Sequence, residues 1–448
     1  MSNNINLKKG LDIPISGEAA RKVVKKVVPD IVAVKPGDFK GFSPRLLVRE
    51  GDRVLAGSPL MADKQNPSIL VTSPVSGTVS EVCRGDKRKL LAVLVKADTQ
   101  QEYVDFGVSN PAVLDNAAVR ELLLKSGLWP AIIQRPYGVL ADTAAKPKSI
   151  FISAFSTAPL SPEADFVLGD RFDDVQAGIT ALSRLTDGGV HLCLSSKNYS
   201  GTPFHKIEGA ILHTVSGRHP AGNPGVQISH ISPIMKGETV WTVSLLMTAA
   251  IGRLINTGKL DLSRKVAVTG PAAVNPAYVE TVPGVPVKEL CEAGEDVRVI
   301  GGDVLSGEIL GKDGYLGFAQ DQITLLKEGR DREVLGWAKP FRPGVHSTSM
   351  CYFSWLTPRK KYDMDTNLHG GPRAFVETKC FEDVTPMDIF PIYLIKACLA
   401  GDIEKMEKFG IYEVLPEDLA LCDYVDPSKN DIQAIIQNGI DLMIKEMA

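Results

Sequence analysis

The chain has 448 residues, which is enough for about three domains that each build their own core. Hydrophobic residues make up 44% of it and charged residues 23%, a composition typical of globular proteins that excludes extended disorder. The formal net charge of -3 argues against a general nucleic-acid binder, because such a protein needs a dominant basic face to neutralise phosphates.

The sequence predicts no targeting or membrane-spanning segment. Residues 1–9 are polar with no apolar run behind them, unlike a signal peptide. The longest uncharged apolar stretch, residues 240–252, is shorter than the roughly 20 residues that cross a bilayer. We therefore expect a soluble protein that meets a membrane only through partners. Its basic clusters at 21–26 and 359–361 are either solvated faces or contacts to anionic headgroups or an acidic partner.

The cysteines are scattered and contain no C-x-x-C pair. This spacing contradicts a disulfide framework, a zinc ribbon and an iron–sulfur motif, and it indicates reduced thiols in a cytosolic compartment. The seven positions are Cys83, Cys193, Cys291, Cys351, Cys380, Cys398 and Cys422.

Residues 1–102 predict a small barrel-sandwich β domain preceded by an N-terminal extension. Short apolar runs at 46–48, 59–61, 69–71, 77–79 and 90–95 alternate with Gly, Pro and Asp turn signals. Many short strands at close, even spacing are typical of a small barrel or sandwich.

Residues 103–260 predict a Rossmann-like α/β domain. Apolar runs at 149–152, 190–194 and 210–213 read as buried strands, and helical spacing is found at 117–124, 172–185 and 240–254. Strands that alternate with helices indicate a mostly parallel sheet.

Residues 261–333 predict a β-grasp domain, the fold of soluble-ligand-binding modules. Strands at 265–269, 297–300 and 323–326 surround a short helix at 287–292. The remaining residues, 334–448, predict a largely helical region with helices at 387–400, 402–410 and 432–446. The whole chain is thus expected to be a multidomain α/β protein.

Residues 48–54 and 72–79 resemble a biotinyl/lipoyl carrier domain. In that family an exposed hairpin presents a lysine for the cofactor, and Lys64 stands near the corresponding place. The loop around it is longer than in typical lipoyl domains and contains Asn66-Pro67, which favours an ordinary turn lysine. A carrier protein modified on Lys64 remains the alternative function.

Residues 125–129 (KSGLW) resemble the approach to the flavin site in two families: the NADH-oxidising flavoprotein of complex I and the C-subunit of the electron-transport complex. Those families continue with a glycine-rich loop that lies against the flavin. This chain continues instead with the bulky stretch 129–138, which contains two prolines, and it lacks cluster-binding cysteines. We therefore expect no flavin, iron–sulfur cluster or metal ion bound by this chain.

Motifs spread over nearly the whole chain resemble the A-subunits of the Na+-translocating NADH:quinone oxidoreductases. Each motif alone is weak, but their common order and compatible spacing are specific. One departure is Asp426-Pro427, where many relatives have Cys-Pro. The matching stretches are KKGLDIPISG (8–17), TSPVSG (72–77), SGLW (126–129), residues 135–136, HPAG (219–222), residues 270–271, VLSG (304–307), YLG (315–317), EGRD (328–331), residues 336–337 and EDLALC (417–422).

The resemblance implies a peripheral subunit on the cytoplasmic face of the bacterial inner membrane. In that family a six-subunit complex passes electrons from NADH through flavins and iron centres in other subunits to ubiquinone or menaquinone, while Na+ crosses the membrane. The A-subunit lies near the quinone-reducing membrane subunit and is not catalytic alone, so we expect no catalytic residue here.

Association of this family with quinone suggests residues that could hold one. A quinone needs an apolar slot and donors for its two carbonyl oxygens. The plainer interpretation of the candidates is core aromatics, interface aromatics and a satisfied loop histidine. The candidates are Phe39, Phe42, Trp129, Arg135, Tyr137 and His219.

Overall fold

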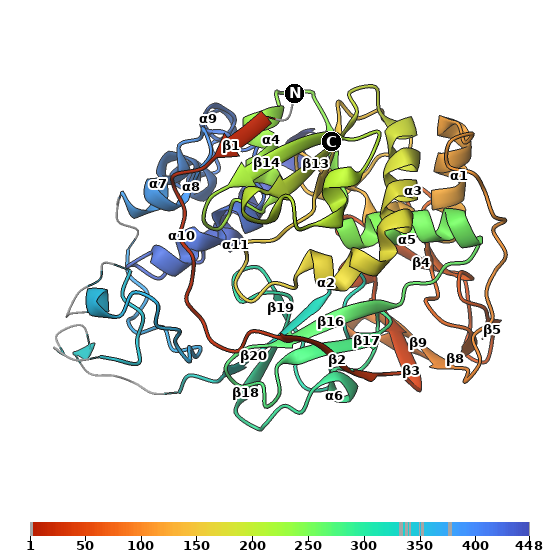
Figure 1. Cartoon of the computed structure of the whole chain (residues 1–448), viewed down its shortest axis with the longest axis horizontal. Helices are drawn as coiled ribbons and strands as arrows, with labels where there is room; N and C mark the ends of the chain where they lie inside the picture. Colours follow the sequence, from red (N-terminus) through yellow and green to blue (C-terminus); the bar gives the residue numbers. More distant parts are fainter. Residues whose placement is uncertain are drawn as a thin grey trace.

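The computed structural model describes residues 3–330, 335–336, 339, 342–348, 350, 354–374 and 379–447. Three sheet-based units and a group of C-terminal helices pack together in this part of the chain (Figure 1). Asp331, Trp337, Cys351 and the expected domain boundary at 333/334 lie outside the described residues.

Two antiparallel sheets form the barrel-sandwich unit. One has the order β3 (Ile31–Val34), β9 (Leu90–Ala97), β8 (Gly77–Arg84) and β5 (Arg53–Val54), and the other β4 (Pro44–Leu46), β6 (Pro59–Asp63) and β7 (Leu70–Thr72). Alternate side chains point inward, as the period of a strand requires, and enclose a core of Val32, Val54, Leu60, Val79 and Val93.

The α/β unit has a seven-stranded sheet. Its order is β1 (Asn3–Asn6), β14 (Ile211–Ser216), β13 (Val190–Ser195), β12 (Ile150–Ser153), β15 (Val240–Thr242), β10 (Ile133–Arg135) and β11 (Val139–Leu140). The first five strands are parallel neighbours, and β10 and β11 are antiparallel additions. Its helices are α1 (Asn116–Ser126), α2 (Ala164–Leu168), α3 (Phe172–Leu182), α4 (Pro224–Ile231) and α5 (Leu245–Thr257).

The predicted helix at 240–254 is wrong in its first turn. Residues Val240–Thr242 form β15, and α5 begins only after Ser244, whose hydroxyl accepts a hydrogen bond from the Met247 amide at 3.2 Å. The run is apolar throughout, so periodicity alone does not separate a buried strand from a buried helix. The serine N-cap is the signal that does.

The third unit is a six-stranded mixed sheet. Its order is β19 (Glu308–Ile309), β18 (Val297–Gly301), β20 (Gln322–Lys327), β16 (Arg264–Thr269), β17 (Ala277–Thr281) and β2 (Ala20–Lys26). β16 and β17 form an antiparallel pair, while β16 lies parallel to β20. The short helix α6 (Val287–Leu290) contributes its apolar side chains to the core of this unit.

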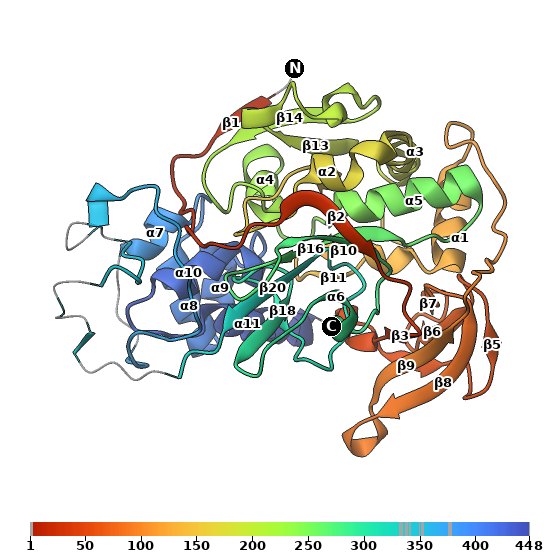
Figure 2. The same ribbon diagram turned by 60° about the horizontal axis from the view of Figure 1, so that its bottom comes forward.

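The first 26 residues do not join the barrel. β1 lies parallel to β14 in the α/β sheet (Figure 2). β2 lies parallel to β17 in the third sheet. The N-terminal segment therefore ties two other units together. Because β2 is exposed along its whole length, it carries no apolar alternation that would have predicted it.

The C-terminal helices are α7 (Cys380–Val384), α8 (Pro391–Ala400), α9 (Ile403–Phe409), α10 (Ala420–Val425) and α11 (Ile432–Met447). Their apolar side chains share one core with Leu7, Val215 and Val226 of the α/β unit, so the two parts form a continuous body. Within the described residues, no helix combines the length and apolarity needed to cross a membrane.

Candidate functional site

Arg135 lies at the end of β10 and joins the α/β unit to the C-terminal helices. Its guanidinium is 1% exposed and contacts Asp418 Oδ2 at 2.7 Å and Glu417 Oε1 at 2.9 Å. Burial disfavours the guanidinium charge, but these two carboxylates outweigh it and raise the pKa of Arg135. The side chain is therefore a permanent cation at the junction.

The acidic side of this pair is held by its own backbone turn. Asp418 Oδ2 also accepts the Leu415 amide at 3.0 Å, one turn earlier in the chain. Gly225 of α4 lies directly against both charged groups, and a side chain there would collide with Asp418 and Arg135. Two buried polar atoms, Arg135 Nε and Asp418 Oδ1, have no hydrogen-bond partner among the described residues.

Tyr137 follows two residues later and contacts the same part of the C-terminal region. Its ring lies edge-on to Tyr412 with 6.2 Å between centroids. Lys40 Nζ, from the barrel-sandwich unit, donates to the Tyr137 carbonyl at 3.2 Å and to Gln437 Oε1 of α11 at 2.7 Å. Burial lowers the pKa of Lys40. Three units therefore meet within one hydrogen-bond network.

Phe39 and Phe42 flank Lys40 on the barrel side. Their ring centroids are 5.9 Å apart, and Phe39 packs at 5.0 Å against Phe318 of the third unit. Phe39 is buried, whereas Phe42 is partly exposed. This loop crosses β11, where the Leu140 amide donates to the Lys40 carbonyl at 3.3 Å.

Trp129 lies apart from these residues, inside the core of the α/β unit. Its indole Nε1 donates to the Ala141 carbonyl at 2.9 Å, and its ring packs edge-on to Trp241 at 5.5 Å. Arg120 lies 5.6 Å from the centre of the same ring. These side chains fill the space directly after α1, so this segment does not present the bare backbone that a flavin ring requires. The described part of the chain also holds no group of three or more His, Cys, Asp or Glu side chains suited to a metal ion.

His219 lies in the loop after β14, where its backbone amide donates to Asp12 Oδ1 at 2.9 Å. It is 4% exposed, and its Nδ1 lies 3.2 Å from Thr157 Oγ1. Burial lowers the pKa of His219, although Asp303, Asp12 and Asp418 act against this. The ring is therefore neutral at physiological pH and can form hydrogen bonds without carrying charge.

Of the six predicted residues, Arg135 and Tyr137 contact the C-terminal region. Phe39 and Phe42 flank Lys40, which donates to the Tyr137 carbonyl. Trp129 and His219 have other partners, Ala141 and Thr157. Sequence reasoning missed Lys40, although it lies between the two predicted phenylalanines. It quoted Glu417 and Asp418 only as part of a motif, because nothing local shows that a buried arginine lies opposite them.

Lys64 occupies the turn between β6 and β7, with its side chain exposed. The hairpin is docked against the α/β unit and is not free to swing. Asn66 Nδ2 donates to Thr143 Oγ1 at 2.7 Å, Thr72 Oγ1 donates to the Ser126 carbonyl at 2.9 Å, and Ile69 is part of the α/β core. A carrier domain instead needs a hairpin that stands free of its neighbours, so that the attached cofactor can move.

Comparisons with known proteins match the chain from end to end. Residues 5–98 match the model of the NqrA N-terminal barrel-sandwich hybrid domain, residues 114–260 the NqrA second alpha/beta domain, and residues 265–311 the NQRA C-terminal domain. Three relatives, each named as the A-subunit of Na(+)-translocating NADH-quinone reductase, are 36% identical to it. They come from Rhodopirellula baltica (98% of this chain, 98% of the relative), Marinomonas sp. (98% and 99%) and Histophilus somni (99% and 100%). The chain therefore belongs to the NqrA family, the A-subunits of the Na(+)-translocating NADH-quinone reductases.

Proposed function

We propose that this chain is the peripheral A-subunit of a six-subunit membrane complex that couples NADH oxidation and quinone reduction to Na+ export. It lies on the cytoplasmic face of the bacterial inner membrane, beside the quinone-reducing membrane subunit. The observation that carries the proposal is the unbroken similarity, at 36% identity, over 98% of this chain and 98% of a relative with that name.

The proposed role of the chain is to hold other subunits in place and to contact quinone, with no redox cofactor of its own. NADH, flavins and iron centres belong to other subunits. Support comes from the segment after α1, which is packed with Trp129 and Trp241, and from the network around Lys40 and Arg135, which locks the units into one body.

We also propose bounds and a fold type for each of the four domains. Residues 1–102 comprise an N-terminal extension and a biotinyl/lipoyl-like barrel-sandwich domain, 103–260 a Rossmann-like domain, 261–333 a β-grasp domain and 334–448 a helical domain. The parallel pairing of β16 with β20 between two antiparallel pairs supports the β-grasp assignment.

Quinone contact is proposed at the junction of Phe39, Phe42, Arg135, Tyr137 and His219. Phe42 and Tyr137 are its partly exposed aromatic rings, and Lys40 supplies a cationic donor beside them. Together they offer an apolar face and a donor, which is what a quinone carbonyl needs. Trp129 contributes to this site from the core, where its indole nitrogen donates to the Ala141 carbonyl directly after β11.

The first test is capture of the tagged chain, produced at its native level, from detergent-solubilised membranes. The eluate is assayed for Na+-stimulated quinone reduction by NADH. We expect membrane subunits and this activity to elute together. Elution of the chain alone, without activity, would contradict the assignment. The intact mass of the chain would then show whether Lys64 carries a modification.

The quinone contact is tested separately in the assembled complex with Lys40→Met and Tyr137→Phe. Loss of the charge-assisted donor in Lys40→Met predicts a KM for quinone that rises by about tenfold, and loss of the neutral hydroxyl in Tyr137→Phe predicts a smaller rise. The rate of NADH oxidation with an artificial electron acceptor in place of quinone is expected to stay unchanged. Lys96→Met, the same change at an exposed position of β9, is the control. Unchanged quinone kinetics in both variants would rule out contact at this junction.

A further inference from the structure

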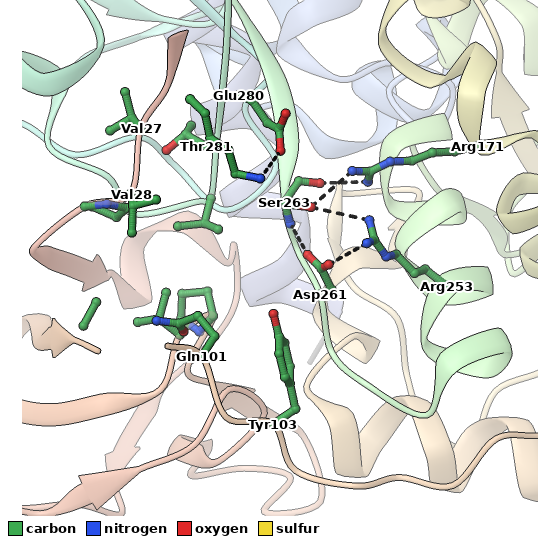
Figure 3. A pocket seen from close by; sticks show the side chains of 16 residues that line it. Val27, Val28, Gln101, Tyr103, Arg171, Arg253, Asp261, Ser263, Glu280 and Thr281 are labelled. Carbon is green, nitrogen blue, oxygen red and sulfur yellow. Dashed lines mark hydrogen bonds and ion pairs between the residues drawn. The ribbon is translucent and has the colours of Figure 1, made fainter. Parts of the chain in front are cut away.

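A cavity of about 280 Å³ lies where the barrel, the α/β unit and the third sheet meet (Figure 3). It shares no residue with the Arg135 junction. Its lining falls into a polar group on one side and an apolar group on the other. The polar group includes Arg171, Arg253, Asp261 and Ser263, and the apolar group includes Val27, Val28, Pro74, Val75 and Val282.

Two arginines converge on one serine in the polar wall. Arg171 Nη1 donates to the Ser263 carbonyl at 2.8 Å, and its Nη2 donates to Ser263 Oγ at 3.2 Å. Arg253 reaches the same hydroxyl at 3.4 Å with Nη1 and pairs with Asp261 Oδ2 at 2.7 Å through Nη2. The side chains come from different elements, so their convergence depends on the tertiary fold.

The charged groups that line the cavity leave one positive charge in excess, because Lys26 pairs with Glu280 and Arg253 with Asp261. Arg253 is paired with Asp261, but Arg171 has no carboxylate within ion-pair distance among the described residues. Burial and the neighbouring Arg253 lower the pKa of Arg171, while Asp261 and Asp170 counteract them only in part. A half-buried cation without a direct counter-ion favours an anion in the adjacent space.

The cavity is also rich in unused donors. Thr281 lines it, is 3% exposed, and its hydroxyl has no hydrogen-bond partner in the part of the chain that the structure describes. The Ser263 hydroxyl accepts from both arginines, so its own proton remains available. A guanidinium has five N–H donors, of which each arginine uses two here. A ligand with several acceptor atoms would satisfy these groups.

The opposite wall is mostly apolar, with Gln101 as a polar group on that side. In Figure 3, Val27 and Val28 lie across the cavity from Arg171 and Arg253, with Tyr103 at its edge. Its apolar side chains offer no hydrogen bonds to a hydrated inorganic ion, but they can bury a ring or a short alkyl chain. An apolar cavity of about 150 Å³ holds benzene, so a space of about 280 Å³ accepts a ring that carries an acidic group.

We propose that this cavity binds a small amphipathic anion, a ring or short chain that bears one carboxylate or phosphate group. The acidic group lies between Arg171, Arg253 and Ser263, and the apolar body lies against Val27 and Val28. The site is independent of the proposed quinone contact. Because its walls come from three units, an occupied site fixes their relative arrangement and stabilises the fold in proportion to ligand occupancy.

The test uses the full-length chain and three probes of similar size. They are the anions 4-fluorobenzoate and phenyl phosphate and the neutral isostere 4-fluorobenzamide. Calorimetry measures the binding of all three, and fluorine NMR measures the binding of the two fluorinated probes. We expect at least one anion to bind and the amide to bind at least tenfold more weakly. A preference for benzoate or for phenyl phosphate identifies the acidic group. Equal binding of the amide, or no binding of either anion at millimolar concentration, overturns the proposal.

Variants locate the binding within the molecule. Arg171→Gln is expected to weaken binding of the preferred anion at least tenfold. Thr281→Val, which replaces the unpartnered hydroxyl with a methyl group of the same shape, keeps the fold and weakens binding to a smaller degree. Arg45→Gln, at an exposed position of β4, is the matched control and leaves binding unchanged. Wild-type affinity in both folded cavity variants would place the ligand elsewhere and overturn the proposal.

Discussion

Arg135 Nη1 and Asp418 Oδ2 lie 2.7 Å apart, although 283 positions separate the two residues in the sequence. Both side chains are at most 2% exposed. An ion pair this deeply buried is costly to desolvate, so its net contribution to stability depends on both partners being present. It specifies how the C-terminal helices dock on β10.

Removal of one partner is therefore expected to be strongly destabilising. Asp418→Asn leaves Arg135 with only the half-exposed Glu417, and we expect the free energy of unfolding to fall by about 3 kcal/mol. Urea denaturation followed by tryptophan fluorescence measures this change.

Two further variants distinguish the effect of the buried ion pair on stability from the effect of an exposed one. Arg135→Met combined with Asp418→Leu is expected to recover a large part of the loss, because no unpaired charge remains. Lys361→Gln, which breaks the exposed pair with Glu18, changes stability by less than about 1 kcal/mol. A loss for Asp418→Asn as small as that for Lys361→Gln would show that the buried pair is unimportant.

Much of the fold follows from local sequence patterns. The strands at 150–153, 190–195 and 264–269 are apolar runs between turn signals, and α1 begins beside Asp115, whose side chain accepts the Ala118 amide. Periodicity and capping are local properties, so sequence reasoning can find them.

The rest depends on partners that are distant in the chain. β2 is exposed and shows no apolar alternation, and only its pairing with β17 makes it a strand. Likewise, Arg135 was proposed for its chemistry, but its carboxylates come from a turn in a different unit. Lys40 likewise finds its two acceptors in other units, the Tyr137 carbonyl and Gln437 of α11. No residue near any of them in sequence encodes these contacts.

The crossing of α3 and α5 gives a second prediction. Gly252 of α5 lies so close to α3 that a methyl group there would collide with the Asp174 carbonyl oxygen. Since backbone cannot move aside as a flexible side chain does, Gly252→Ala is expected to lower stability by about 1–3 kcal/mol. The thermal unfolding midpoint measures the effect.

Gly169→Ala is the matched control for this crossing. Gly169 has an ordinary helical conformation, with φ of -62°, and open space where its side chain would stand. Its substitution should leave the midpoint unchanged or raise it slightly. If both variants unfolded at the wild-type temperature, close approach of the two helices would not be a requirement of the fold.

The stability of the α/β unit is expected to depend on pH through a stacked pair of histidines. His191 lies between Phe151, at 4.5 Å, and His213, at 5.1 Å between ring centroids, and its Nδ1 is 2.8 Å from His213 Nε2. Burial, followed by repulsion from His213, lowers the pKa of His191 from 6.5 to about 4. Burial also lowers the pKa of His213.

Between pH 6.5 and about 4 the unfolded chain therefore binds a proton at His191 that the folded chain does not. Stability contributed by the neutral ring is complete above pH 6.5 and is lost as the pH falls through this window. In His191→Gln the proton uptake on unfolding should fall by about one in the window, whereas the slope above pH 7 should match the wild type. Urea denaturation at half-unit pH steps measures both slopes. Identical slopes for the two proteins between pH 4 and 6.5 would show that His191 titrates normally in the fold.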